Sequence, residues 1–287
     1  MSVIKGFAIA AANSGFDKTG KSYEQIVDIC LKSGFKGLEG GPNLFEKVPL
    51  KELERIRRLF ADADLVIETY HLPYKDPVLN DVATLYEADR KKVENNLKKH
   101  IDIAAALGAS VGIIHPTSKK DCLTEEEGLE RLLGQAGKTI QGILKHSEQY
   151  SFKIAVENML PYLGDRLGSK IIHLEMILKR NDHPLLGFCL DTGHALVSHH
   201  EKAMDVFHFM KERLIAFHLA DNSGDRDSHL APGHGKFFWK EFAKEFKKIN
   251  YSGTMCVETP PFSYGPDYSV EAWKTMHDEV SAIMGQA

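Results

Sequence analysis

Four residues whose side chains can bind a metal or move a proton end short apolar runs in the second half of the sequence. Glu157 ends the run KIAVE, Asp191 ends LLGFCLD and His218 ends LIAFH. Glu258 in turn ends GTMCVE. Three carboxylates and one imidazole form an oxygen-rich ligand set that suits Mn²⁺, Mg²⁺ or Co²⁺. If the four groups meet, their like charges call for a cation to neutralise them.

Two earlier apolar runs end in the same way, on His71 and His115, which makes six consecutive runs in all. A helix cap or a turn is the structural alternative for any one of these positions, and Asp often has that role. Histidine and glutamate are poor caps, however, and capping does not account for six runs in succession. Additional histidine ligands would widen the choice of metal to Zn²⁺. The absence of cysteine from the set argues against a purely structural zinc site.

The longest polar stretch of the sequence, residues 221–235, follows the run that ends at His218. It contains Arg226, Asp227 and His229, which could supply further metal ligands or substrate contacts. Its glycines allow a tight fold over a site. The alternative is a solvated loop with ordinary turn chemistry.

The elements that must position these residues alternate along the chain. Short runs rich in β-branched residues predict strands, and the amphipathic stretches between them predict helices. The strands are expected at residues 3–10, 37–39, 65–71, 110–115, 153–157, 185–191, 214–218 and 253–258. The helices are expected at residues 22–33, 50–63, 83–107, 125–150, 169–180, 201–212, 237–249 and 270–284.

Eight such pairs predict an α/β protein with a single (β/α)₈ TIM barrel that fills one domain, residues 1–287. A doubly wound open sheet is the alternative, but it would place a glycine-rich phosphate turn after the first strand, and AAANSG at 10–15 does not supply one. Active sites of parallel barrels lie at the carboxyl ends of the strands, which is where the acidic and histidine residues fall.

The composition is that of an ordinary globular protein, with 43% hydrophobic and 26% charged residues among 287 and a net charge of −4. Neither a nucleic-acid partner nor a membrane partner is indicated. The amino-terminal segment makes a poor signal peptide, and the four cysteines include no CxxC pair. Cys30, Cys189 and Cys256 lie in apolar segments and are interpreted as core residues. We therefore expect a reducing, cytoplasmic location.

Two segments carry a family resemblance: GFCLDTGH at 187–194 and HLADNSGDRDSHLAPGHG at 218–235. They resemble the xylose isomerase-like TIM-barrel superfamily, which unites sugar isomerases and epimerases with the endonuclease IV class of abasic-site nucleases (AP endonuclease family 2). The resemblance extends over nearly the whole chain. The superfamily's metal positions fall on nine residues: His71, His115, Glu157, Asp191, His194, His218, Asp227, His229 and Glu258.

For the sugar enzymes, the resemblance implies one divalent ion held by Glu157, Asp191, His218 and Glu258. The two glutamates would flank a sugar-like small molecule, one removing a proton from carbon and the other returning it. His194 and Arg226 would contact substrate oxygens. A lyase or dehydratase of keto-sugars or inositols would use the same first step. Barrels of this kind often pair, so a homo-oligomer is a further hypothesis.

The runner-up function is an abasic-site endonuclease with a three-zinc cluster formed by all nine positions. The sequence departs from the nuclease pattern because Gly193 replaces a cysteine, no lysine follows Asp221-Asn-Ser, and Lys75-Asp-Pro follows Tyr74. The predicted loops around the site are also poor in arginine, whereas gripping a bent duplex needs basic side chains. A third class, a sensor without catalysis, would be expected to lose ligands, and this chain keeps them. A metal-dependent sugar isomerase or epimerase is the favoured prediction.

Overall fold

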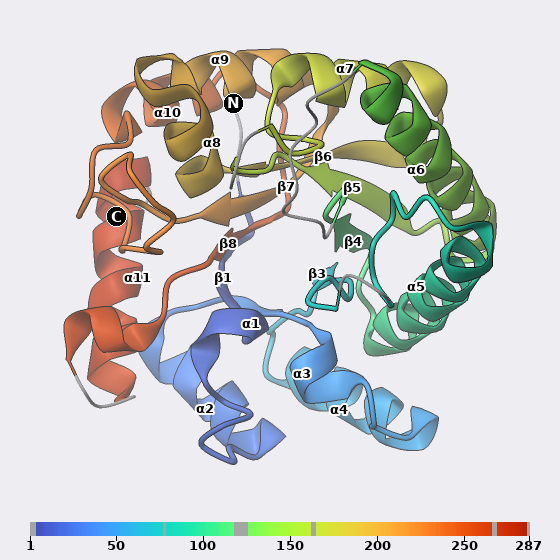
Figure 1. Ribbon diagram of the computed structural model, residues 1–287. Helices are drawn as coiled ribbons and strands as arrows, with labels where there is room; N and C mark the ends of the chain where they lie inside the picture. Colours follow the sequence, from blue (N-terminus) through green and yellow to red (C-terminus); the bar gives the residue numbers. More distant parts are fainter. Residues whose placement is uncertain (1–3, 77–78, 118–125, 162–164, 266–268, 286–287) are drawn as a thin grey trace.

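The computed structural model describes residues 4–76, 79–117, 126–161, 165–265 and 269–285. Eight parallel strands stand in a ring at its centre, and helices surround them (Figure 1). The strands are β1 (Gly6–Ala10), β2 (Gly37–Glu39), β3 (Thr69–His71), β4 (Val111–Ile114), β5 (Lys153–Glu157), β6 (Leu186–Asp191), β7 (Leu214–Leu219) and β8 (Thr254–Val257). All eight predicted strands are therefore confirmed, most of them shortened by one to four residues at their ends.

The hydrogen-bonded strand order is β2-β1-β8-β7-β6-β5-β4-β3, and the ring closes where β2 meets the segment that leads into β3. The amide of Leu38 donates to the carbonyl of Val66 at 3.0 Å, and the amide of Gly40 donates to that of Thr69 at 2.9 Å. Gly37 permits this approach, because a Cβ at that position would lie 1.8 Å from the Val66 oxygen. The prediction of a TIM barrel is confirmed, and the open-sheet alternative is wrong.

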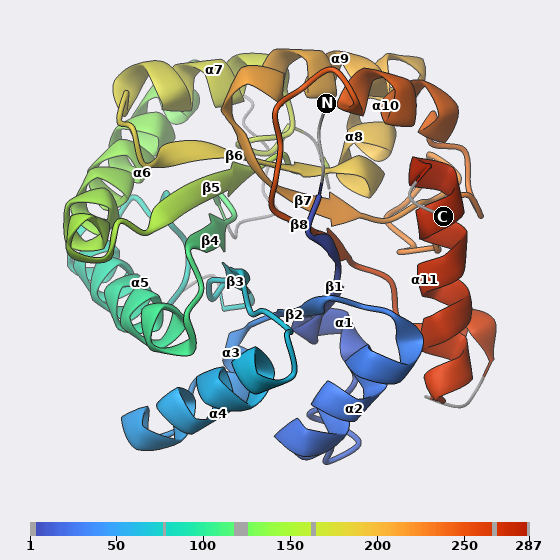
Figure 2. The ribbon, with the colours of Figure 1, turned by 180° about the vertical axis from the view of Figure 1, so that it is seen from behind.

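The eight predicted helices surround the barrel (Figures 1 and 2). They are α2 (Tyr23–Ser33), α4 (Leu50–Asp62), α5 (Glu87–Leu107), α6 (Glu126–Ser147), α7 (Ile171–Arg180), α9 (Ala203–Met210), α10 (Trp239–Phe246) and α11 (Val270–Met284). Three helices that the sequence analysis did not predict follow strands: α1 (Ala11–Ser14), α3 (Pro42–Phe45) and α8 (Thr192–His199). α1 and α3 have only four residues each, too few for a helical periodicity to be recognised.

The core has two parts. The larger one lies between the strands and the outer helices, where side chains from both layers are buried together. A smaller one fills the barrel interior with residues of β4 to β7: Val111, Ile113, Ala155, Cys189 and Ala216. This layer is a packed floor, and the polar strand ends stand directly above it. Cys30, Cys189 and Cys256 are buried and unpaired, as predicted, while Cys122 lies outside the described residues.

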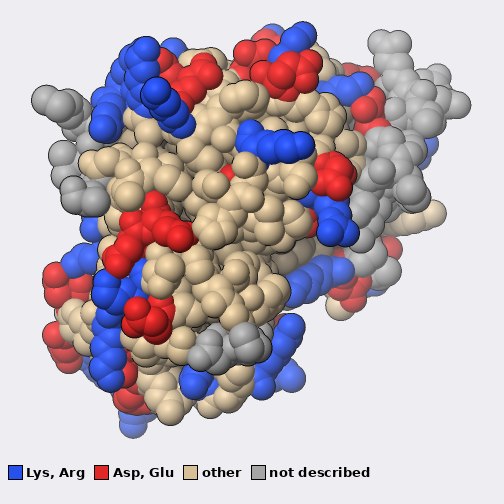
Figure 3. All heavy atoms as spheres, turned by 90° about the vertical axis from the view of Figure 1, so that its left-hand side faces the viewer, with Lys and Arg blue, Asp and Glu red and all other residues tan. Residues whose placement is uncertain are grey.

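The outer surface is mixed in charge on the flank that Figure 3 presents, where basic and acidic side chains are interspersed. Several charged side chains of the described residues form ion pairs within one helix, such as Lys32 with Asp28 and Lys274 with Asp278. None of the helices in the described ranges is both long enough and apolar enough to cross a bilayer.

His100 of α5 is an internal histidine that ties the helix layer to the barrel. Its Nδ1 lies 3.1 Å from the hydroxyl of Tyr70 on β3, and both residues are fully buried. The structure thus places Tyr70 in the core. Burial lowers the pKa of His100 to about 4, because the charged imidazolium loses its hydration inside the protein.

This lowered pKa makes stability depend on pH in a defined direction. An unfolded chain binds a proton at His100 near pH 6.5, whereas the folded chain binds it only near pH 4, so stability is lost as the pH falls between these values. Urea unfolding should therefore show that the stability advantage of the wild type over His100→Gln shrinks by about 2 kcal/mol from pH 7 to pH 5. His208→Gln, at an exposed position of α9, should show no such change. If the wild type were more stable than His100→Gln by the same amount at both pH values, the lowered pKa of His100 would be contradicted.

Candidate metal centre

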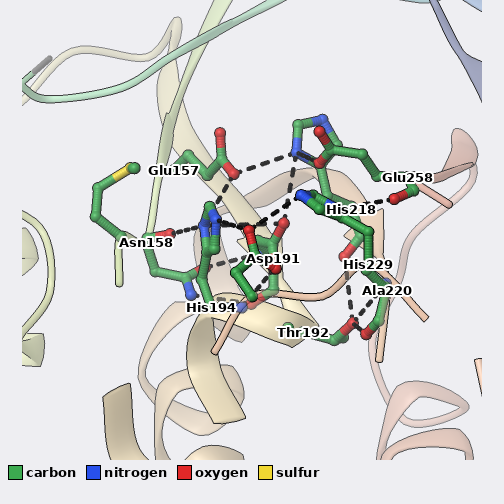
Figure 4. A network of polar contacts seen from close by, with 12 residues as sticks. Glu157, Asn158, Asp191, Thr192, His194, His218, Ala220, His229 and Glu258 are labelled. Atoms are coloured by element: carbon green, nitrogen blue, oxygen red, sulfur yellow. Dashed lines mark hydrogen bonds and ion pairs between the residues drawn. The ribbon is translucent and has the colours of Figure 1, made fainter. Parts of the chain in front are cut away.

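The carboxyl ends of β5 to β8 bring four predicted ligands into one buried cluster. Glu157 and Asp191 are the last residues of β5 and β6, His218 lies on β7, and Glu258 follows β8. Glu157, Asp191, His218 and Glu258 each offer a ligand atom, and these atoms all lie within 4.8 Å of one another. At most 7% of any of these residues is exposed. Parallel strands of a barrel finish at the same rim, which is why residues far apart in sequence meet here (Figure 4).

The imidazole of His218 lies at the centre of this cluster. Its Nδ1 is 3.0 Å from Oε2 of Glu258 and 3.3 Å from Oε1 of Glu157. The same nitrogen is 3.9 Å from Oδ2 of Asp191. The three carboxylates thus surround one nitrogen, and the four side chains point toward a common space (Figure 4).

Asp191 has two roles at once, through its two carboxylate oxygens. Oδ1 accepts a hydrogen bond of 2.6 Å from the amide of His194 and so caps the amino end of α8. Oδ2 is buried and has no hydrogen-bond partner among the described residues. The helix-cap alternative is therefore true of Asp191, but it accounts for only one of the oxygens. A buried carboxylate oxygen without a donor is the feature that a bound cation would satisfy.

His71 and His115 adjoin the cluster on the side of β3 and β4. Their Nε2 atoms are 3.6 Å and 3.1 Å from Oε2 of Glu157, and the three residues form a second group with ligand geometry. The ring of Tyr74 packs over both imidazoles, with centroid distances of 4.5 Å and 4.4 Å. Glu157 therefore uses one oxygen toward His218 and the other toward this histidine pair.

His194, Asp227 and His229 form a third group on the opposite side of Glu157. Nε2 of His194 lies 3.4 Å from Oδ2 of Asp227, and Nε2 of His229 lies 3.0 Å from the same oxygen. Nδ1 of His194 is 3.2 Å from Oε1 of Glu157, which connects this group to the central cluster. All nine residues that the family resemblance indicated are thus brought together.

Charge and burial shift the pKa values of the cluster in opposite directions. Burial raises the pKa of Asp191 to about 7, and the neighbouring charges of Glu157 and Glu258 add to the rise. Burial opposes ionisation of Glu258 as well, but the charge of His218 outweighs it and lowers its pKa to about 2. The pKa of Glu157 is likewise well below its usual range, because the charges of His218 and His115 outweigh burial. Both glutamates are therefore carboxylates at neutral pH.

The donor set fits a divalent cation. Three carboxylates and an imidazole converge within bonding reach of one point, they are shielded from water, and Asp191 directs an oxygen without a hydrogen-bond donor into the group. Such a set of oxygen and nitrogen donors is typical of Mn²⁺, Mg²⁺, Co²⁺ or Zn²⁺ sites.

A cavity of about 290 Å³ opens directly above the cluster. Its walls include Glu157, Glu258, His194, Tyr74 and Arg166. A second cavity of about 450 Å³ shares Tyr74 and Lys75 with the first and extends over the loops that follow β1 to β3. Volumes of this size are typical of small-molecule sites.

One predicted contact residue does not line this cavity. Arg226 is exposed on the long loop, whereas Arg166, from the loop after β5, reaches the cavity wall. Two aromatic residues near the long loop and β8 do not line the cavity either: Trp239 donates its indole N–H to Asp221 at 2.6 Å, and Phe262 is 58% exposed. Asn13, a residue of α1, has its Nδ2 3.4 Å from Oε1 of Glu258 and 3.2 Å from the carbonyl oxygen of Glu258. Only the position of Asn13 after the first strand pointed to the site.

Asp221 is a buried carboxylate whose structural role the sequence analysis did not identify. Its Oδ1 accepts the amides of Asn222 and Phe237, at 2.9 Å and 3.0 Å. Its Oδ2 accepts the amides of Gly233 and Gly235 and the indole N–H of Trp239. Five donors from both ends of the long loop therefore converge on one side chain. The loop that carries Asp227 and His229 is closed by this charge and is not a freely solvated segment.

The comparisons with known proteins agree with this architecture. The sequence profile of the xylose isomerase-like TIM-barrel family matches residues 27–278, and the chain belongs to that family. A solved D-tagatose 3-epimerase-like protein superposes with a TM-score of 0.80 at 20% identity, covering 98% of this chain and 97% of its own.

Of two curated relatives, one has a name that states no function and the other is named as a nuclease. "Uncharacterized protein y4fM" of Sinorhizobium fredii is 25% identical over 83% of this chain and 81% of its own. "Probable endonuclease 4" of Carboxydothermus hydrogenoformans is 28% identical over 52% of this chain and 48% of its own. Family membership is thereby established, while the reaction has to be argued from the site.

The position of Asp221 makes a stability prediction. In Asp221→Asn, one acceptor oxygen becomes an amide donor that faces N–H groups, so we expect unfolding to require about 2–4 kcal/mol less. Urea titration measures the loss. Asp225→Asn, at an exposed position of the same loop, is the control and should stay within about 0.5 kcal/mol of the wild type. Equal effects of the two substitutions would refute the role given to Asp221.

Proposed function

We propose that this protein is a divalent-metal-dependent isomerase or epimerase of a sugar, keto-sugar or sugar derivative, with residues 1–287 as one barrel domain. The observation that carries the proposal is the buried convergence of Glu157, Asp191, His218 and Glu258 beneath the 290 Å³ cavity. The fold likeness to an epimerase-like protein is in keeping with it.

Glu157, Asp191, His218 and Glu258 would hold the metal ion. When bound, such an ion polarises neighbouring oxygens and makes the proton on the adjacent carbon easier to remove. The remaining groups of the cavity wall, His194 and Arg166 among them, would orient the hydroxyl groups of the substrate.

The two glutamates would carry out the proton transfer. They enter the cavity from different strand ends, Glu157 from β5 and Glu258 after β8, and both are ionised at neutral pH. One carboxylate would take the proton from the carbon beside the carbonyl group, which leaves an enediolate. The other, after taking up a proton from solvent, would return it to the opposite face of the same carbon in an epimerase or to the neighbouring carbon in an isomerase. Loss of water from the same enediolate would make the enzyme a dehydratase instead.

The dimensions of the site are consistent with a small polyhydroxylated substrate. The cavity above the cluster is lined by polar groups on the cluster side and by Tyr74, Met159 and Leu160 elsewhere. The adjoining 450 Å³ cavity would leave room for a substituent on the sugar. A sugar derivative would therefore fit the site as well as a free ketose.

The proton-transfer role predicts a loss of exchange in a conservative variant. The wild type, loaded with Mn²⁺, should incorporate solvent deuterium at carbon into one of a panel of ketoses and keto-glycosides, measured by NMR in D₂O. Glu157→Gln and Glu258→Gln should each lower the rate at least about 10²-fold, because an amide cannot accept the proton. The exposed Glu54→Gln is the control and should exchange at the wild-type rate. Undiminished exchange in Glu157→Gln would rule out the proposed chemistry.

An abasic-site endonuclease is the second candidate, favoured by one specific observation. The two outer groups, His71 with His115 and His194 with Asp227 and His229, flank the central cluster and share Glu157 with it. A three-metal nuclease would need all of these ligands, and a partial relative bears a nuclease name. The partner would then be DNA and the metal Zn²⁺.

Metal content distinguishes the two candidates. Elemental mass spectrometry of the purified protein should find about one Mn²⁺, Mg²⁺ or Co²⁺ per chain if the sugar proposal is correct. Close to three Zn²⁺ per chain would favour the nuclease, and cleavage of an abasic-site duplex would then be the assay. No metal, even after incubation with each ion, would contradict both candidates.

A further inference from the structure

Glu39, the last residue of β2, is a buried carboxylate that does not line the cavity above the metal cluster. Only 1% of it is exposed. One of its oxygens accepts a hydrogen bond of 2.7 Å from the hydroxyl of Thr69 on β3. Its two oxygens lie 3.1 Å and 3.3 Å from Nε2 of His218, across the barrel interior on β7. Because Glu39 does not reach the cavity, contact with the substrate does not explain its presence.

The two nitrogens of His218 face opposite environments. Nε2 faces Glu39, while Nδ1 faces Glu258 and Glu157 at 3.0 Å and 3.3 Å. An imidazole that binds a metal is neutral, with one proton and one lone pair, and the partner of one nitrogen determines which of them the other presents. A proton on Nε2, donated to Glu39, leaves the lone pair on Nδ1, directed at the cluster.

We infer that Glu39 is a positioning residue that orients His218 as a metal ligand. Its carboxylate accepts the Nε2 proton, selects the tautomer with a free Nδ1 and fixes the plane of the ring. Carboxylate–histidine pairs of this kind also make the imidazole a stronger donor to the metal, and losing the carboxylate typically weakens metal affinity 10–100-fold. The inference rests on the proposed metal site and adds to it a residue outside the ligand set.

The surroundings of the pair leave Glu39 as the partner that selects the tautomer. The ring of His218 stacks on that of His71, with centroids 5.5 Å apart and an interplanar angle of 18°. Cys256 lies near both Glu39 and His218, and Cys189 forms a hydrogen bond with His218, but thiols are only weak hydrogen-bond partners. Thr69 in turn holds Glu39 by donating its hydroxyl proton. The chain Thr69–Glu39–His218 thus runs from β2 and β3 across the barrel to the metal cluster.

A purely structural role is the alternative, and it predicts a different result. An internal carboxylate–imidazole pair that only supported the fold would, when broken, lower the melting temperature and leave metal affinity unchanged. A positioning role requires the dissociation constant for the metal to rise in a variant that is still folded. The two roles are therefore separated by a binding measurement on the metal-free protein, independent of any activity.

The test is a calorimetric titration of the metal-free protein with MnCl₂. Glu39→Gln keeps the size of the side chain but removes its charge, and its dissociation constant should be 10–100-fold above that of the wild type. With CoCl₂, the visible absorption bands of the variant should also differ, because they report ligand geometry at the ion. Glu68→Gln is the matched control. Its carboxylate pairs with Lys5 and accepts the amide of Thr254 away from the cluster, so its dissociation constant should equal the wild-type value.

Thr69→Val is the second variant, since it releases Glu39 without changing any charge. Its dissociation constant should lie between those of the wild type and Glu39→Gln, and it decides the question if Glu39→Gln does not fold. An unchanged constant in the folded Glu39→Gln, or in Thr69→Val where that variant decides, overturns the inference. If the wild type itself binds no metal, the proposed function fails first, which distinguishes the two failures.

Discussion

The concentration of negative charge at one buried point is the constraint on which the rest of the structure depends. Glu157, Asp191 and Glu258 are held within contact distance of one imidazole, almost entirely out of water. Without compensation, such an arrangement would be strongly unfavourable, because like charges repel most where water cannot screen them. The surrounding histidines supply part of the compensation, while burial and the neighbouring carboxylates raise the pKa of Asp191. A divalent cation is the natural complement.

The barrel holds these charges together because its closure leaves them little freedom. Backbone hydrogen bonds run around the whole ring, and Gly37 allows β2 to approach the neighbouring segment closely enough to complete it. The packed layer of apolar side chains inside the barrel fills the space beneath the strand ends. Above this floor, the long loop is closed by the five hydrogen bonds of Asp221. Because the backbone on every side is rigid, the mutually repelling carboxylates cannot move apart, and the stability of the fold offsets the free energy of their repulsion.

Several side chains of the site make two sets of contacts at once. Asp191 caps α8 with one oxygen and directs the other at the cluster. Glu157 faces His218 with one oxygen and the pair His71 and His115 with the other. This sharing explains why the same nine residues can be considered for one metal or for three. Glu157 is the residue that the one-metal and the three-metal proposals share.

The sequence by itself determined the strand and helix alternation, the barrel class and six acidic or histidine residues at the barrel mouth, because each of the six lies at the carboxyl end of a strand. The family resemblance added His194, Asp227 and His229. The tertiary structure decided which side chains lie across from one another. In the folded barrel, Glu39 contacts His218 and does not line the cavity, and Asp221 accepts hydrogen bonds from both ends of the long loop. Arg166 lies in the cavity wall, where Arg226 was expected. The physical reason is that local patterns specify the direction of a side chain along its own strand. Contacts between β2 and β7, by contrast, depend on the closure of the whole ring.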